Sequence, residues 1–134
     1  MSDLVKELKN DHEKLLNIML DAQKLGLATD AGRSKLMEGK MLLTEHLRKE
    51  DSRLYPELKK LSAGEAYSSK IVDEFSSEMK GLSATVIDFI NRAGTAEIDM
   101  EYAKELGRII SSLRMRIRKE EIQLYPLYER LSSV

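Results

Sequence analysis

The sequence predicts an all-α protein that folds as an up-down-up-down four-helix bundle. Four segments repeat apolar residues with helical spacing, and short glycine-containing breaks separate them. No segment alternates apolar and polar residues in the way that marks a strand. Because each helix carries one apolar stripe that its neighbours must cover, and the connections are short, we expect the four helices to pack antiparallel.

The ends of the helices follow from residues with strong positional preferences. Ser2 is the expected N-cap of the first helix, because a serine oxygen accepts a hydrogen bond from the free amides of the first turn. Gly26, Gly64 and Gly94 stand where the first, second and third apolar patterns stop. The expected helices span residues 2–25, 31–61, 67–92 and 97–131.

The second and fourth expected helices are related by an internal repeat. Residues 43–62 align with residues 113–132 without a gap, and nine of the twenty positions are identical. The first and third helices match more weakly, at an offset of 67 residues. Both strong copies contain Leu-Tyr-Pro, and a proline removes a backbone donor, so we expect a kink one to two turns after Glu50 and after Glu120.

Composition narrows the class of protein. The 134 residues fit one domain, which we place at residues 1–134. The absence of cysteine excludes a disulfide scaffold and thiolate metal ligands. The net charge of −1 argues against a nucleic-acid partner, and no apolar run approaches the roughly 20 residues that cross a bilayer. We therefore expect a cytoplasmic protein with no membrane or nucleic-acid partner; the sequence identifies no protein partner.

Ionisable residues interrupt the apolar stripes. Burying such groups costs several kcal/mol each unless they are paired or bind a metal. Two histidines and two glutamates from three helices have the composition of a metal site inside a bundle. The alternative is a metal-free ion network in which Arg116 pairs with the two glutamates. The inward residues are His12, His46, Glu50, Arg116 and Glu120.

Three further residues lie close to these positions in the helical pattern. Met79 offers a thioether, but its spacing is typical of core packing. We expect Tyr55 and Tyr125 to pack between helices with their hydroxyls reaching solvent; the alternative is a hydrogen-bonding or redox role beside a metal.

The motifs DHEKLL, EHLRKEDSRLYP and RKEEIQLYP resemble the hemerythrin-like family, also called HHE cation-binding domains, over essentially the whole chain. The resemblance implies a non-heme di-iron centre inside a four-helix bundle. It places one histidine on the first helix, H-x-x-x-E on the second, histidines on the third, and a histidine followed by a carboxylate on the fourth. The functions implied are O₂ binding, O₂ or NO sensing, iron handling or repair of iron–sulfur clusters.

The chain departs from the family pattern on the third and fourth helices. Phe75 and Met79 stand at the third-helix histidine positions, and Arg116 stands at the fourth-helix histidine position. The resemblance assigns these lost histidines to one iron, so one half of the centre is missing. The retained ligands are His12, His46, Glu50 and Glu120, with Glu121 as the register alternative to Glu120.

We hypothesise that Arg116 replaces the second iron and that the four retained ligands hold at most one iron ion, with positions open to water, O₂ or NO. Divalent iron, Arg116 and two carboxylates sum to the same charge as two divalent irons, two carboxylates and a bridging hydroxide. The alternative is a metal-free regulatory or interaction module in which Arg116 neutralises Glu50 and Glu120. An enzymatic role is less expected, because the cluster-repair members of the family use the full set of histidines.

Overall fold

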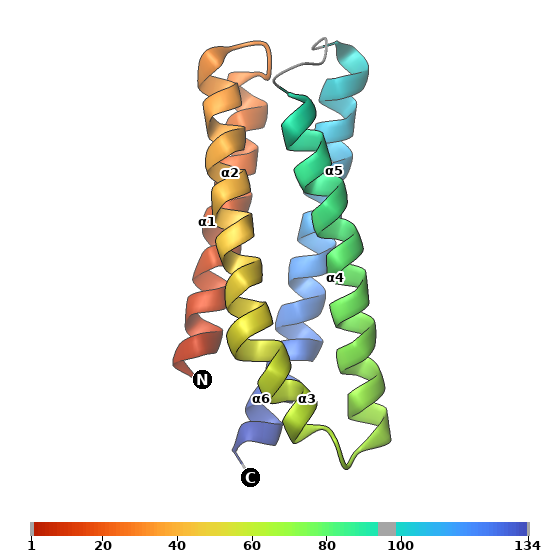
Figure 1. The fold of residues 1–134 in the computed structure, drawn as a ribbon. Helices are drawn as coiled ribbons and strands as arrows, with labels where there is room; N and C mark the ends of the chain where they lie inside the picture. Colours follow the sequence, from red (N-terminus) through yellow and green to blue (C-terminus); the bar gives the residue numbers. More distant parts are fainter. Residues whose placement is uncertain (1, 94–98, 134) are drawn as a thin grey trace.

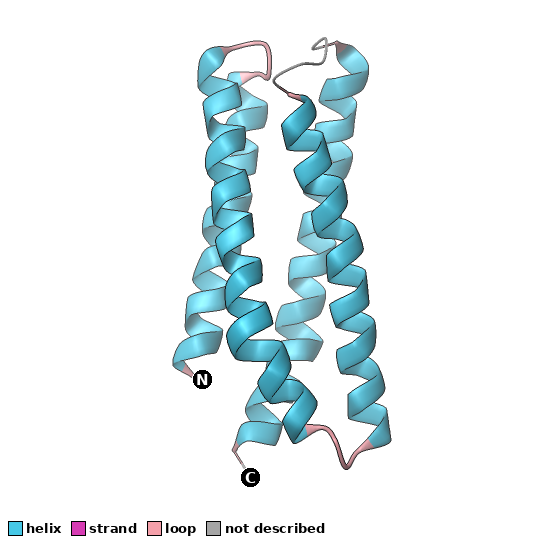
Figure 2. Ribbon diagram, in the orientation of Figure 1, coloured by secondary structure: helices cyan, strands magenta, loops and turns pink. Residues whose placement is uncertain are grey.

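The computed structural model, which describes residues 2–93 and 99–133, consists of long helices joined by short turns (Figures 1 and 2). No strand occurs among these residues. The predicted break at Gly94 and the predicted helix start near Glu97 lie outside the described part of the chain. The α-helices are α1 (Asp3–Leu25), α2 (Asp30–Lys49), α3 (Tyr55–Leu61), α4 (Ala66–Arg92), α5 (Met100–Lys119) and α6 (Tyr125–Ser132).

The helices form a closed ring with alternating direction, which confirms the predicted up-down-up-down bundle. α1 contacts α2 and α5, and α4 contacts the same two helices from the other side. The start of α1 and the end of α6 lie toward the same end of the bundle (Figure 1). Within the described residues, no helix is both long enough and apolar enough to pass through a bilayer.

The ends of α1 and the start of α2 are formed by residues with strong positional preferences. The Ser2 hydroxyl accepts a hydrogen bond from the Val5 amide at 3.1 Å, which confirms the predicted N-cap. Gly26 ends α1 with φ of 87°, a conformation that favours glycine. Thr29 caps α2 by accepting a hydrogen bond from the Gly32 amide at 3.0 Å.

A π-helical turn stands before each Leu-Tyr-Pro proline. The segment η1 (Glu50–Leu54) joins α2 to α3, and η2 (Glu120–Leu124) joins α5 to α6. In each turn the tyrosine amide donates to the carbonyl of the glutamate five residues earlier. The π turns therefore begin at Glu50 and Glu120 themselves, whereas the sequence predicted a kink one to two turns after each of them. Because a π turn closes over five residues, it brings the glutamate and the tyrosine onto one face of the helix.

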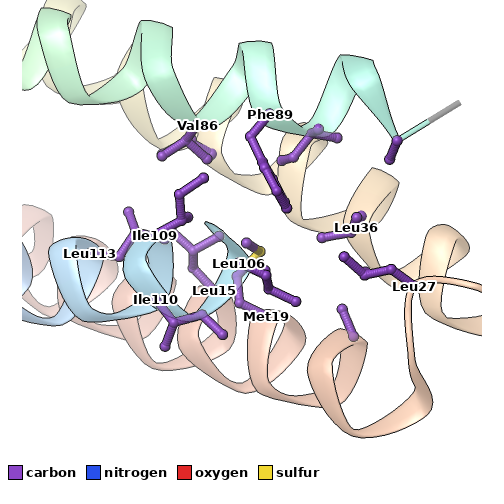
Figure 3. Close-up of a cluster of buried hydrophobic side chains, with 14 of the residues drawn as sticks. Leu15, Met19, Leu27, Leu36, Val86, Phe89, Leu106, Ile109, Ile110 and Leu113 are labelled. Atoms are coloured by element: carbon purple, nitrogen blue, oxygen red, sulfur yellow. The ribbon is translucent and has the colours of Figure 1, made fainter. Parts of the chain in front are cut away.

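Two apolar clusters fill the bundle. The upper cluster (Figure 3) lies toward the α1–α2 turn, and the lower cluster lies toward the chain ends. On α1, His12 stands between Leu8 of the lower cluster and Leu15 of the upper one. The upper cluster consists of Leu15, Met19, Ala22, Leu27, Leu36, Leu43, Met79, Val86, Phe89, Ile90, Ala93, Tyr102, Leu106, Ile109, Ile110 and Leu113. The lower cluster consists of Leu4, Val5, Leu8, Leu54, Tyr55, Leu58, Val72, Phe75, Leu124, Tyr125 and Leu127.

The turn between α1 and α2 requires glycine at position 32. A Cβ atom there would lie 1.9 Å from the backbone oxygen of Gly26. We expect Gly32→Ala to lower the free energy of unfolding by about 1–3 kcal/mol, because backbone must move to relieve the overlap. Gly81→Ala is the matched control: a Cβ on this exposed α4 residue meets no atom within 4 Å, so it should raise stability by about 0.5–1 kcal/mol. Urea unfolding measures both, and equal effects would contradict the assignment of Gly32.

Candidate metal centre

The structure gathers the predicted ligands in a polar layer between the two apolar clusters. His12 Nε2 lies 3.4 Å from Glu120 Oε1, and His46 Nε2 lies 3.5 Å from Glu50 Oε1. The two imidazole rings are 4.8 Å apart at their centroids. All four side chains are 3% exposed or less. His12, His46 and Glu120 each offer a ligand atom within 4.8 Å of the others, and these three residues form a group that could hold a metal ion; Glu50 is not part of that group.

Each histidine is oriented by a carboxylate on its outer nitrogen. His12 Nδ1 lies 2.8 Å from Glu121 Oε2, and His46 Nδ1 lies 3.0 Å from Asp11 Oδ2. A carboxylate only accepts, so Nδ1 donates in both pairs, and a neutral imidazole then turns the lone pair of Nε2 inward. Metal-bound histidines are commonly held in this way. Glu120 and Glu121 therefore both contact His12, on opposite nitrogens.

Tyr125 lies in the middle of the layer, so the expectation that its hydroxyl reaches solvent is wrong. Its side chain is 0% exposed, and its hydroxyl donates to Glu50 Oε2 at 3.0 Å. The Tyr125 hydroxyl oxygen also lies 3.1 Å from His12 Nε2. Tyr55 is buried as well, and its hydroxyl accepts from Arg116. The π turns explain the difference, because they rotate both tyrosines toward the glutamates.

Arg116 points inward but does not bridge the two glutamates. Its Nη1 donates to Glu78 at 3.2 Å, and its Nη2 donates to the Phe75 carbonyl at 2.6 Å. Its Nε lies 3.9 Å from Glu120, and no ion pair among the described residues joins Arg116 to Glu50. The predicted neutralisation is thus limited to a loose contact with Glu120, because other partners occupy the remaining guanidinium nitrogens.

Phe75 and Met79, which stand at the expected third-helix histidine positions, lie in different surroundings. The Phe75 ring lies under the Arg116 guanidinium at 4.6 Å, which is a cation–π contact, so Phe75 supports the arginine with both ring and carbonyl. Met79 belongs to the upper cluster, as its core spacing indicated, and its carbonyl accepts from the Ser83 hydroxyl.

The internal repeat extends to the outer contacts of the polar layer, where the half that contains His46 and the half that contains Arg116 have matching partners. Asp11 accepts from Lys49 at 3.1 Å while it orients His46. At the related positions of the other half, Glu78 accepts from Lys119 at 3.1 Å while it pairs with Arg116. The acid and the lysine are kept in both halves, and only the inward group changes from imidazole to guanidinium.

The interior of the layer holds more acceptors than donors. The buried atoms without a hydrogen-bond partner include His46 Nε2, Glu50 Oε1 and both carboxylate oxygens of Glu120. Burial raises the pKa of Glu50 well above its ordinary value, and the nearby Glu120 carboxylate raises it further. Burial also raises the pKa of Glu120. Such a site is completed either by protons or by a cation.

The donor set fits a divalent transition metal. Imidazole nitrogens and carboxylate oxygens together suit iron, zinc and manganese. The orphaned lone pairs and the oriented imidazoles meet the two requirements of such a centre, which are free ligand atoms and fixed ring directions.

Comparison with known proteins gives one match. The family described as the hemerythrin HHE cation binding domain matches residues 3–128. No curated protein and no solved structure matches the chain. The matched range includes all the residues of the polar layer.

The raised pKa of Glu50 makes the stability of the metal-free protein depend on pH. The folded protein holds the Glu50 proton to higher pH than the unfolded chain, whose glutamates titrate near pH 4.5. The stabilisation that this proton gives the folded state is therefore complete below pH 4.5 and is lost as the pH rises through the pKa of Glu50 in the folded state. We expect Glu50→Gln to remove this loss and to be more stable than the parent protein by about 1–4 kcal/mol at mildly alkaline pH.

Urea unfolding of chelator-treated protein across this pH range measures the effect. Glu13→Gln changes an exposed carboxylate on α1 and should leave the pH dependence as it is in the parent protein. The same pH dependence in Glu50→Gln and in the parent protein would contradict the assignment.

Proposed function

The chain belongs to the hemerythrin HHE cation-binding domain family, and from this premise we propose that it binds a single non-heme iron ion and serves as a binding or sensing protein for O₂ or NO. The ligands proposed are His12, His46, Glu50 and Glu120. The observation that carries the proposal is the set of inward lone pairs that have no hydrogen-bond partner although the side chains are buried.

The electrostatic balance supports one cation. Arg116 is paired with Glu78, which also binds Lys119, and Lys49 is paired with Asp11, so these cations have acidic partners outside the centre of the layer. Glu50 and Glu120 remain as two buried carboxylates whose charges have no full partner inside the layer. A divalent ion balances them. The guanidinium reaches Glu120 only through a loose contact of 3.9 Å and does not reach Glu50, so it does not supply the charge that we assign to the ion beside the histidines.

The other half of the layer leaves no place for a second ion. A guanidinium has no lone pair to give to a metal. Arg116 also donates to Glu78, the Phe75 carbonyl and the Tyr55 hydroxyl, so the arginine already engages these oxygen atoms. The arginine side therefore acts as a fixed wall of the site, and this favours one ion per chain.

The protein residues would control access and proton position around the ion. The upper and lower clusters exclude bulk water from both ends of the layer. Asp11 and Glu121 keep the imidazole protons on the outer nitrogens. Bound ferrous iron supplies a redox-active centre with positions open to a diatomic ligand. A small apolar molecule can reach such a dry layer more readily than an ion, which favours O₂ or NO as the ligand.

Iron content tests the proposal directly. Protein loaded anaerobically with ferrous iron should hold one ion per chain, and His46→Ala should weaken iron binding by more than the roughly 100-fold that outer contacts contribute, because it removes a ligand. Glu45→Gln, an exposed change beside His46, should bind as the parent protein does. Equilibrium dialysis with elemental analysis measures the content, and NO titration followed by EPR tests the open position. Iron content far below one ion per chain, unchanged in His46→Ala, would support the metal-free module instead.

Asp11 gives a second test that leaves every proposed ligand in place. Asp11→Asn removes the charged acceptor from His46 Nδ1, so the ring loses its fixed direction and part of its basicity. We expect iron affinity to fall about 10–100-fold. Glu7→Gln is the matched control, because Glu7 contacts the same Lys49 from the surface and does not contact His46. Competition with a coloured chelator measures both affinities, and equal values would show that Asp11 does not orient a ligand.

A further inference from the structure

Tyr125 brings a buried phenol oxygen into contact with two of the proposed iron ligands. Its hydroxyl lies 3.0 Å from Glu50 Oε2 and 3.1 Å from His12 Nε2, and its ring lies nearly parallel to that of His12. The phenol has one proton. Its oxygen also carries lone pairs, and it lies between an imidazole nitrogen and a carboxylate oxygen, the two kinds of ligand atom in the proposed site.

The distances around this oxygen are those of hydrogen bonds, and they also fit donor atoms arranged around one ion. Ligand bonds of about 2.1 Å meeting at a right angle place two donor atoms about 3.0 Å apart, and wider angles place them about 3.4 Å apart. The two contacts of the Tyr125 oxygen match the first value. The His12–Glu120 and His46–Glu50 contacts, at 3.4 and 3.5 Å, match the second.

We propose that the phenol oxygen of Tyr125 is a fifth ligand of the iron ion, and that this ligand favours the ferric state. The inference rests on the proposed function, since it requires that the layer binds iron. On binding, the O–H bond of Tyr125 breaks, its electron pair stays on the oxygen that bonds the ion, and the proton leaves to solvent. A ferric ion then balances the phenolate and the carboxylates of Glu50 and Glu120, which makes the ferric complex neutral and the ferrous complex anionic.

The repeat shows why the two related tyrosines differ. η1 and η2 place Tyr55 and Tyr125 on the faces of their own glutamates in the same way. Tyr55, however, meets the Arg116 guanidinium, whereas Tyr125 meets His12 and Glu50. Tyr125 therefore lies on the half of the layer that keeps its histidines, and Tyr55 lies on the half that the arginine fills. This makes Tyr55 an internal control for Tyr125.

Visible spectroscopy of the ferric protein tests the proposal. Protein loaded with ferric iron as its nitrilotriacetate complex should show a phenolate-to-iron charge-transfer band, and excitation in that band should enhance tyrosine ring vibrations in the resonance Raman spectrum. Tyr125→Phe should lose the band and the vibrations while its ring still packs in the lower cluster. Tyr55→Phe should keep both.

Iron content, measured on the same samples, separates the two proposals. Iron bound by the parent protein without a charge-transfer band, or a band that survives in Tyr125→Phe, would overturn the role of Tyr125 and leave the iron site intact. Failure of the parent protein to bind iron would overturn both. If Tyr125→Phe does not fold, ring-deuterated tyrosine in Tyr55→Phe keeps the test decisive: the enhanced vibrations must shift, and their absence or lack of shift would overturn the proposal.

Discussion

The structure depends on how a layer of buried acceptors is compensated inside an apolar bundle. Two hydrophobic clusters stabilise the helices above and below this layer, but they also remove the water that would otherwise solvate its carboxylates and imidazoles. The outer nitrogens of His12 and His46 are satisfied by Glu121 and Asp11, whereas most inward atoms are not. Positive charge at the centre, whether from protons or from a metal ion, therefore compensates the burial of these groups.

The two halves of the layer are compensated differently. In one half, the histidines present lone pairs that an ion can use. In the other, Arg116 brings its own positive charge and pairs with Glu78, so that half needs no ion. Since Asp11 and Glu78 each bind a lysine at related positions, the outer framework is the same on both sides. The two halves thus differ at the inward position, where Arg116 corresponds to His46 in the repeat.

The π turns connect the sequence repeat to the geometry of the site. A regular α-helix would place residues five apart on different faces, so Tyr125 would not lie beside the face of Glu120. The missing proline donor allows the wider turn, because no amide at that position requires its usual partner. The Leu-Tyr-Pro motif thereby sets the direction of a tyrosine, and this direction brings a phenol oxygen to Glu50 and His12.

The sequence alone determined which residues face inward and which helices carry them, because helical periodicity assigns each side chain to a face of its own helix. The inward positions of His12, His46 and Arg116 follow from that rule, whereas Ser2 as a cap follows from the local preference of serine for that position. Only the tertiary structure decided which inward groups meet, since partners such as His12 and Glu121 are 109 residues apart and periodicity says nothing about distance between helices.

Tyr125 was misplaced because a π turn shifts the register on which the periodic pattern relies. Asp11 and Glu78 were missed as partners because each lies beside a stripe position and is recognisable only once the opposite helix is in place. Helix positions are local properties of the chain, whereas the pairing of buried charges depends on packing between distant segments.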